Sequence, residues 1–334
     1  MLNIKSHKGV YSVEFMDLEA IPKIENSIGI IDSNVLKLYG DILTPKVDTF
    51  FVMEANEENK TLDFCIHLIG VLRDMGIKKN TTLVAMGGGI TQDVTAFISS
   101  ILFRGINWSF IPTTLLAQAD SCIGSKTSIN HNSVKNLVGS FYPPSNIWCD
   151  YKVLESLDDS DIDSGIGEML HYFMLSDSSQ LSKIDKSNLN PSIQESLKIK
   201  KKMIELDEFD QVERRIFNYG HTFGHALEVL SSYTLKHGSA VTLGMHLANY
   251  VAFRFGLITE DHLNYLQSKI LFNIPEYRIE DIDEYITLLL QDKKNTSTDL
   301  VCILPHGVKD FRVTTISDIV KLKSYIEEWS EIIS

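Results

Sequence analysis

The sequence predicts an α/β domain with a mostly parallel sheet over residues 1–151, followed by an all-α domain over residues 152–334. Up to about Tyr151, short apolar runs alternate with helical patterns, as is typical of a parallel sheet covered by helices. Beyond that point the strand pattern nearly vanishes and long helical patterns dominate. The length of 334 residues also exceeds what one small core needs, which makes two domains the default.

The predicted strands of the first half are short apolar runs, of the kind that a parallel sheet buries on both faces. They are Ile28–Asp32, Phe50–Met53, Leu83–Met86, Trp108–Ile111 and Asn146–Asp150. Helical patterns at Thr61–Met75 and Thr91–Phe103 stand between them. Because ligands bind at the carboxyl ends of the strands in such sheets, we expect a binding site there.

The sequence of the second half predicts a series of helices with one interruption. The main helical patterns are Leu154–Phe173, Pro191–Leu206, Ile216–Ser231 and Ser239–Phe255. Val301–Pro305 breaks the series as an apolar run of strand length.

Composition and charge exclude several classes of protein. Hydrophobic content of 44% and charged content of 22% are ordinary for a globular chain. A net charge of −13 argues against a general nucleic-acid binder, although a local cluster of Lys and Arg could still bind an anionic substrate. No apolar run reaches membrane-spanning length, and the N-terminal residues lack a signal-peptide core. The four cysteines are scattered without a CxxC pair, so we expect reduced thiols in a cytoplasmic protein.

A glycine turn follows the predicted strand Leu83–Met86 and opens a predicted helix. Its sequence, MGGGITQD, runs from Met86 to Asp93. Successive glycines let the backbone approach a phosphate closely, and a helix N-terminus favours negative charge. These features favour a nucleotide pyrophosphate site over a plain tight turn. Asp32, at the end of the first predicted strand, could accept hydrogen bonds from a ribose or could simply be a turn residue.

A second polar pattern lies in RRIFNYGHTFGH. It places Arg214, Asn218, His221 and His225 at spacings of three and four residues, which would form one stripe on a helix. Burying such a stripe is costly unless a metal, an anion or a polar substrate supplies partners. The alternative is a solvated helix face, because paired histidines at this spacing only suggest a metal.

Several longer motifs carry a family resemblance. They are the segment Arg104–Asn130 with Lys135 and Asn136, GEML at Gly167–Leu170, FNYGHTFGHALE at Phe217–Glu228, HGSAV at His237–Val241, and DKKN at Asp292–Asn295. In this order they closely resemble the dehydroquinate synthase family of sugar-phosphate cyclases. The match runs from about Ile28 to beyond His306, which is nearly the whole chain.

The resemblance implies an N-terminal NAD-binding domain, a C-terminal helical domain and an active site in the cleft between them. It also implies one divalent metal ion, zinc or cobalt, held by Glu168, His221 and His237. His225, four residues after His221, would then face the substrate phosphate and would not be a metal ligand. Two histidines and one carboxylate leave open positions on a metal for substrate oxygens.

Further roles follow by motif from the same resemblance. The implied NAD contacts are Asp32, Asn34, Glu57, Lys60, Gly87, Gly88, Gly89, Asp93, Thr113 and Thr114, together with Lys126 and Lys135. The implied substrate contacts are Asp120, Lys126, Lys135, Asn136, Lys200, Arg214, Asn218, His225 and a lysine of DKKN, Lys294. Within that set, Lys126, Asn136, Asn218 and His225 would hold the phosphate, and Lys200 and Arg214 the carboxylate. Arg104 resembles an arginine that reaches the neighbouring subunit, which implies a homodimer.

The activity that the resemblance implies is conversion of 3-deoxy-arabino-heptulosonate 7-phosphate to 3-dehydroquinate and phosphate. Transient oxidation of one alcohol acidifies the adjacent C–H bond, phosphate leaves, the hydride returns and an intramolecular aldol reaction closes the ring. The product would serve aromatic biosynthesis through the shikimate pathway, or a specialised metabolite.

Four residues depart from the usual family pattern. His171 replaces a substrate-contacting lysine, Gln92 and Ser125 replace glycines, and Ser239 replaces a glutamate. These changes leave open a sister cyclase that acts on another phosphorylated sugar or amino analogue. Retention of Lys200 and Arg214 argues against a substrate without a carboxylate. A metal-dependent polyol dehydrogenase and a non-catalytic ligand-binding relative are the remaining alternatives.

Overall fold

A computed structural model describes residues 1–132, 134–176, 184–291 and 299–333. The chain divides into two compact units, Met1–Leu157 with Lys200–Phe209, and Asp158–Ile199 with Asp210–Ser334. The segment Lys200–Phe209 therefore packs with the first unit, although it lies far beyond residue 151 in the sequence.

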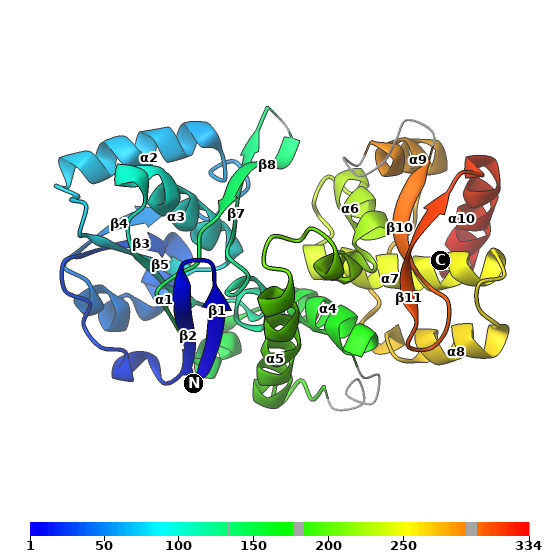
Figure 1. The fold of residues 1–334 in the computed structure, drawn as a ribbon, viewed down its shortest axis with the longest axis horizontal. Helices are drawn as coiled ribbons and strands as arrows, with labels where there is room; N and C mark the ends of the chain where they lie inside the picture. The colour runs from blue at the N-terminus through cyan, green and yellow to red at the C-terminus, as the bar shows by residue number, and fades with distance from the viewer. Residues whose placement is uncertain (133, 177–183, 292–298, 334) are drawn as a thin grey trace. The chain divides into compact units, whose positions relative to one another are not determined.

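The first unit is built on a seven-stranded sheet in the order β1-β2-β9-β6-β5-β3-β4 (Figure 1). Its strands are β1 (Leu2–Ser6), β2 (Gly9–Phe15), β3 (Ser27–Asp32), β4 (Thr49–Met53), β5 (Thr82–Gly87), β6 (Trp108–Pro112) and β9 (Asn146–Cys149). All neighbouring pairs are parallel except β1 with β2. Every residue of β3 and β6 is buried, as expected for apolar strands covered on both faces. The predicted fold class, a mostly parallel α/β half followed by a helical half, is confirmed.

Side-chain caps start two of the helices in this unit. Asp32 accepts backbone hydrogen bonds at the start of α1 (Ser33–Leu43), and Thr61 does so for α2 (Leu62–Asp74). The third helix, α3 (Gly89–Ile101), begins directly after β5 and packs on β5 and β6. The carboxyl ends of the strands and the helix N-termini therefore meet at one edge of the sheet.

The sequence did not predict several elements of the first unit, among them the antiparallel pair β1 and β2. The strands β7 (Lys126–His131) and β8 (Val134–Phe141) form a separate antiparallel hairpin that contacts α3. Before the hairpin, Ala117–Ser121 forms a short π-helix.

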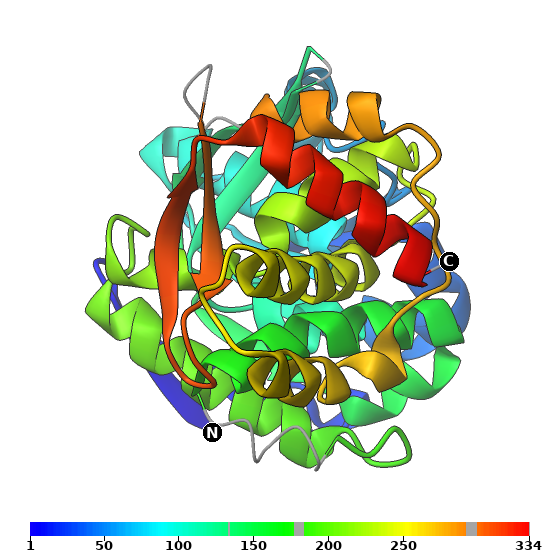
Figure 2. The same cartoon turned by 90° about the vertical axis from the view of Figure 1, so that its right-hand side faces the viewer.

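The second unit is organised around α7 (His237–Arg254), most of whose residues are buried. Its other elements are α4 (Asp159–Ser176), the first part of α5 (Asn190–Leu206), α6 (His221–Leu230), α8 (Glu260–Ser268), α9 (Ile282–Leu290), α10 (Ile319–Ile333), β10 (Leu300–Pro305) and β11 (Phe311–Ile316). Figure 2 shows α7 between α8 and α10, with the β10–β11 hairpin beside it. The predicted strand at Val301–Pro305 is thus β10, which pairs with a strand that the sequence analysis missed.

The segment RRIFNYGHTFGH is not one helix, and the prediction of a single polar stripe is wrong. Glu213–Asn218 forms a 3₁₀ helix, and α6 begins at His221. Gly220 between them has φ +81°, a left-handed conformation that ends the first turn. Arg214 and Asn218 therefore stand on a different element from His221 and His225.

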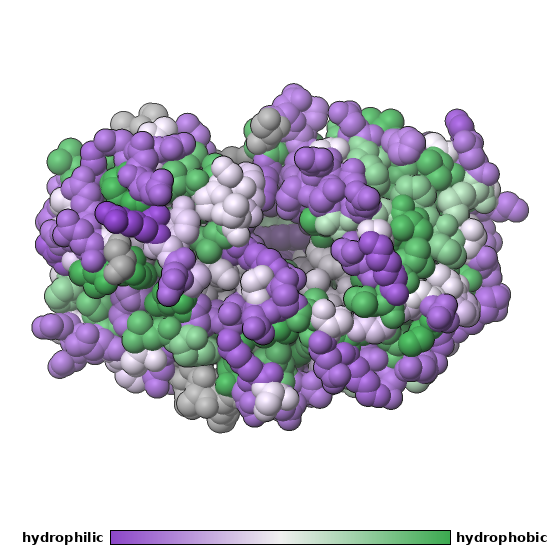
Figure 3. All heavy atoms as spheres, turned by 180° about the vertical axis from the view of Figure 1, so that it is seen from behind, coloured by the Kyte–Doolittle hydropathy of each residue, from purple (hydrophilic) through white to green (hydrophobic). Residues whose placement is uncertain are grey.

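Figure 3 shows hydrophilic and hydrophobic residues interspersed over the visible face of both units. Among the residues that the structure describes, no helix is both long enough and apolar enough to cross a membrane.

Candidate functional site

Three potential metal ligands converge in the second unit. Glu168 lies on α4, His221 is the first residue of α6, and His237 is the first residue of α7. Glu168 Oε1 is 2.8 Å from His237 Nε2 and 3.5 Å from His221 Nε2. One ligand atom from each residue lies within 4.8 Å of the other two. We call these three residues the ligand triad. They are the residues that the family resemblance implied as metal ligands, and the structure brings them together.

Close backbone packing places the triad. A Cβ atom at Gly167, next to Glu168, would lie 2.0 Å from the carbonyl oxygen of Gly238, next to His237. The amide of Gly238 donates to Ser164 Oγ on α4 over 3.0 Å. On the other side of α7, a Cβ atom at Gly224 of α6 would lie 2.8 Å from the carbonyl oxygen of Ala240. Glycine at these contacts lets α7 approach both neighbours, so ligands from three helices reach one point.

The triad suits a divalent ion on chemical grounds. The carboxylate of Glu168 is 2% exposed. Burial alone would raise its pKa, but the nearby His221 and His237 hold it well below the usual value. Burial alone would lower the pKa of His237, but Glu228 and Glu168 raise it well above the usual value. A buried carboxylate with two imidazoles is a donor set found at catalytic zinc sites with open positions.

The structure shows what His171 contacts. It is 1% exposed, and its Nδ1 lies 3.3 Å from Glu168 Oε2, whereas His221 and His237 contact the other oxygen, Oε1. Its ring also packs on Tyr172, with ring centroids 3.9 Å apart, and meets His221 edge to face. The residue that replaces the family lysine is therefore packed behind the ligand carboxylate.

Glu228 is a residue of this site to which the sequence analysis gave no role. Its Oε2 lies 2.9 Å from His237 Nδ1. The sequence carried a signal, because Glu228 follows His221 by seven residues and so lies on the same face of α6. His225, one turn before Glu228, is exposed and stacks on His237 at a centroid distance of 5.5 Å.

Two other predicted residues of this unit lie in the 3₁₀ helix Glu213–Asn218. Arg214 is 5% exposed, and Asn218 Nδ2 donates to the carbonyl oxygen of Arg215 over 2.9 Å. Ser239, which replaces the family glutamate, is buried in the first turn of α7. Lys294 lies outside the described residues.

In the first unit, the glycine turn joins β5 to α3. A Cβ atom at Gly87 would lie 2.5 Å from Thr91 Oγ1, and one at Gly88 would lie 2.9 Å from Thr114 Cγ2. A Cβ atom at Gly89 would have Ser121 Oγ as its nearest neighbour, 3.9 Å away. The first two glycines are thus needed for packing within the protein, whereas the position of Gly89 at the helix N-terminus is less crowded.

Gln92 and Ser125 make internal contacts that account for their departure from glycine. Gln92 exchanges two hydrogen bonds with Ser121, each 2.6 Å long, and so ties α3 to the π-helix. Ser125 Oγ donates to Glu208 Oε1 over 2.7 Å, and its φ of +65° is the left-handed conformation that glycine favours.

Several predicted NAD contacts lie near this turn. Asp32 Oδ1 accepts from the amides of Asn34 and Val35, and Oδ2 accepts from the amide of Ala55. Asn34 is exposed on the first turn of α1. The amide of Thr113 donates to the carbonyl oxygen of Gly87 over 2.9 Å, so the ends of β5 and β6 stay in register.

A polar cluster connects α3, the loop before α2 and the β7–β8 hairpin. Lys60 Nζ lies 2.7 Å from Asp93 Oδ2 and donates to Asn136 Oδ1 over 3.0 Å. Burial raises the pKa of Asp93, and Lys60 partly offsets this effect. Glu57 Oε1 lies 3.7 Å from Lys135 Nζ. The structure therefore brings these five predicted residues together.

The remaining predicted residues of the first unit are an ion pair between buried Lys200 and half-buried Asp120, and two exposed cations. Lys200 is 5% exposed and donates to the carbonyl oxygen of Asp120 over 2.7 Å and to its Oδ1 over 2.8 Å. Lys126 on β7 is exposed, as is Arg104, whose φ is +64°.

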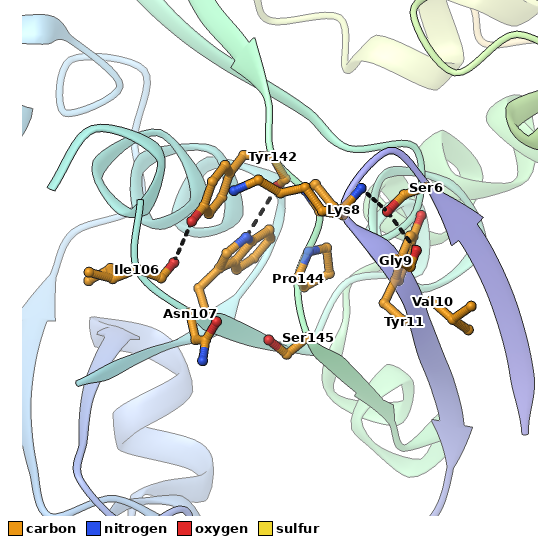
Figure 4. Close-up of a pocket in the computed structure, with 12 residues that line it drawn as sticks. Ser6, Lys8, Gly9, Val10, Tyr11, Ile106, Asn107, Tyr142, Pro144 and Ser145 are labelled. Atoms are coloured by element: carbon orange, nitrogen blue, oxygen red, sulfur yellow. Dashed lines mark hydrogen bonds between the residues drawn. The ribbon is translucent and has the colours of Figure 1, made fainter. Parts of the chain in front are cut away.

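A cavity of about 490 Å³ lies elsewhere in the first unit (Figure 4). It is lined by Ser6 and by residues 8–11, 106–108 and 142–145, and Lys8 Nζ lies 3.6 Å from the ring centre of Tyr142. These segments precede or begin β2, β6 and β9, so the cavity faces the amino ends of parallel strands. The glycine turn is at the opposite edge.

Comparisons with known proteins agree with this arrangement. Family models described as 3-dehydroquinate synthase N-terminal and C-terminal match residues 50–164 and 165–295. A 3-dehydroquinate synthase of Campylobacter fetus subsp. fetus is 33% identical over 324 residues, which cover 93% of each chain.

Solved structures share the fold over almost the whole chain. A 2-deoxy-scyllo-inosose synthase complexed with carbaglucose-6-phosphate, NAD+ and Co2+ has a TM-score of 0.88 at 25% identity, covering 98% of this chain and 99% of the other. A 2-epi-5-epi-valiolone synthase of Streptomyces hygroscopicus subsp. jinggangensis, with NAD+ and Zn2+ bound, has a TM-score of 0.85 at 22% identity, covering 96% and 97%. On the family models and the curated relative, the chain belongs to the dehydroquinate synthase family of sugar-phosphate cyclases.

Proposed function

We propose that this protein is an NAD- and metal-dependent cyclase that converts 3-deoxy-arabino-heptulosonate 7-phosphate to 3-dehydroquinate and phosphate. The observation that carries the proposal is the convergence of Glu168, His221 and His237 from three helices. Relatives that are about one-third identical over nearly the full chain are 3-dehydroquinate synthases, which supports this substrate.

The proposed cofactors are NAD+ and one Zn2+ or Co2+ ion. The 2-deoxy-scyllo-inosose synthase structure contains NAD+ and Co2+, and the valiolone synthase structure contains NAD+ and Zn2+. Gly89 at the N-terminus of α3 would receive the pyrophosphate, and the ligand triad would hold the metal. When bound, they would supply reversible hydride transfer and polarisation of the reacting oxygen.

The protein's own residues would mainly bind and orient the substrate. On the second unit, His225 and Asn218 would hold the phosphate, and Arg214 suits the two oxygens of a carboxylate. On the first unit, Lys126 and Asn136 would contribute to phosphate binding. The departing phosphate can take up the proton itself, so the reaction needs positioning more than a dedicated strong base.

The contacts of Lys200 bear on its proposed role. Lys200 already donates to Asp120 twice, so a substrate carboxylate would join an existing ion pair. We therefore propose that Asp120 orients the Lys200 ammonium before substrate binds.

Purified protein incubated with this heptulosonate phosphate, NAD+ and Zn2+ or Co2+ tests the proposal. We expect release of phosphate together with formation of 3-dehydroquinate. Absence of both products in metal-loaded protein would refute the assigned reaction.

A sister cyclase that acts on another sugar phosphate is the second candidate, favoured by His171 in place of the family lysine. The structure with a TM-score of 0.88 is a synthase of 2-deoxy-scyllo-inosose, complexed with an analogue without a carboxylate. A panel containing the heptulosonate phosphate, a heptulose 7-phosphate and glucose 6-phosphate separates the two candidates. Preference for either of the last two would favour the sister activity.

We also propose a cytoplasmic homodimer. All four cysteines are free and buried, which suits a reducing compartment. Arg104 is exposed, as required of a residue that would reach a second subunit. Size-exclusion chromatography with light scattering would test the dimer.

A further inference from the structure

The two ring nitrogens of His237 face two different carboxylates. Nε2 lies 2.8 Å from Glu168 Oε1, and Nδ1 lies 2.9 Å from Glu228 Oε2. A histidine that binds a metal uses one nitrogen as the ligand and presents the other to a neighbour. The identity of that neighbour decides which nitrogen carries the proton.

His237 belongs to two groups of possible metal ligands. One is the ligand triad, and the other comprises His225, Glu228 and His237. The triad has a fully enclosed carboxylate, with Glu168 2% exposed, and draws its members from three helices. In the second group, His225 is exposed and shares α6 with Glu228. The triad is therefore the better enclosed site, and it uses His237 Nε2.

When Nε2 binds a metal ion, the ring proton of His237 is on Nδ1, which faces Glu228. A carboxylate accepts hydrogen bonds and donates none when it is ionised, so Glu228 Oε2 suits an N–H donor at 2.9 Å. The Glu228 side chain is 13% exposed and the His237 side chain 34% exposed, so the contact is partly shielded from bulk water. The position of Glu228 on α6 is fixed by the same helix that supplies His221.

We propose that Glu228 is a positioning residue for the metal centre, which fixes the tautomer and ring orientation of His237 by accepting the Nδ1 proton. The inference rests on the proposed metal-dependent function. In this arrangement α6 acts on two metal ligands. Its first residue, His221, is itself a ligand, and Glu228 in its third turn orients a second ligand, His237. A carboxylate partner also makes the ring nitrogen at the metal more basic, which strengthens its bond to the ion.

Metal affinity of purified protein tests this role without any substrate. Zn2+ and Co2+ dissociation constants are measured by competition with a chromophoric chelator for wild type, Glu228→Gln and Glu228→Ala. We expect one ion per chain throughout, with affinity lowered about 10-fold in Glu228→Gln and up to about 100-fold in Glu228→Ala. The visible spectrum of bound Co2+ should also change, since it reports ligand geometry. Circular dichroism and thermal unfolding show whether each variant is folded.

Glu208→Gln is the matched control. Glu208 Oε1 lies 3.0 Å from Nδ1 of His7, so this variant alters a similar Glu–His contact, in the first unit and not among the triad residues. Its metal affinity should stay within about twofold of wild type.

Three outcomes would overturn the inference. Equal affinity in wild type and both folded Glu228 variants would show that Glu228 does not position the ligand. Two ions per wild-type chain, reduced to one in Glu228→Ala with the tighter site unchanged, would show that Glu228 is itself a ligand. If folded wild type binds no metal, the inference fails together with the proposed function, whereas the first two outcomes leave that function intact.

Discussion

His246 on α7 shows how a single buried residue links stability to pH. Its Nδ1 accepts a hydrogen bond from Trp329 Nε1 over 2.8 Å, which requires the neutral ring. Burial lowers the pKa of His246 from 6.5 to about 4. The unfolded chain therefore binds this proton more readily than the folded chain.

The resulting prediction concerns stability between pH 7 and pH 5. The contribution of neutral His246 is complete above about pH 6.5 and is lost as the pH falls from there towards 4, by about 2 kcal/mol at pH 5. His246→Gln keeps an acceptor but does not titrate. Urea unfolding measures the free energy of unfolding at both pH values. Its decrease from pH 7 to pH 5 should be about 2 kcal/mol smaller in the variant than in wild type. An identical decrease in both proteins would contradict the proposed role of His246.

His171 is the other informative residue, because it replaces the family lysine and contacts Glu168. His171→Phe would keep the ring packing on Tyr172 but remove the nitrogen that lies 3.3 Å from Glu168 Oε2. We expect Zn2+ affinity to fall about 10-fold with little change in the thermal midpoint. Unchanged affinity would show that His171 only fills space behind the carboxylate.

At the scale of elements, the segment between the 3₁₀ helix Glu213–Asn218 and α6 depends on one glycine. Gly220 has φ +81°, and a Cβ atom there would lie 2.5 Å from Met245 Cγ and 2.7 Å from the carbonyl oxygen of Val241. Gly256 also has a positive φ, +72°, but a Cβ atom there would meet nothing within 4 Å.

These two glycines give a paired prediction. Gly256→Ala should cost only backbone strain, about 1 kcal/mol, whereas Gly220→Ala should cost roughly 2–4 kcal/mol because overpacking adds to the strain. Gly220→Ala should also weaken metal binding, since His221 follows directly. Chemical unfolding and chelator competition measure both effects. Equal destabilisation by the two substitutions would contradict the packing argument.

Strands buried on both faces were predictable from sequence, whereas the β1–β2 and β7–β8 hairpins were not. The runs that became β3, β5 and β6 are apolar because both faces of the sheet are covered. β8 is mostly exposed or half-buried, so its sequence lacks a strong apolar pattern. Helical spacing likewise cannot reveal the left-handed conformation of Gly220, which is why the single polar stripe was wrong.

The parts of the site that were predictable from sequence are the residues that lie in family motifs. The motifs predicted Glu168, His221 and His237 as ligands, and the structure brings these residues together. The Nδ1 contact of Glu228 depends on how α6 packs against α7, which residue spacing alone does not specify. The contacts of Gln92 with Ser121 and of Ser125 with Glu208 depend on tertiary structure in the same way.

At the scale of the whole molecule, no single position in the sequence separates the two units. Residues 200–209 return to the first unit, where Lys200 binds Asp120 and Glu208 accepts from Ser125. These contacts join residues about 80 positions apart, and local patterns do not record them. The two units separately hold the glycine turn and the ligand triad.

The proposed function requires that the whole molecule cyclises a sugar phosphate and recycles its NAD+. The most direct test follows phosphate release and NADH absorbance together, with the heptulosonate phosphate in large excess over NAD+ and with metal-loaded protein. We predict many phosphates released per NAD+ with no accumulation of NADH, loss of activity when a chelator removes the metal, and recovery when Zn2+ or Co2+ is restored. NADH that rises in step with turnover, or NADH formed without phosphate release, would contradict the claim and identify a dehydrogenase instead.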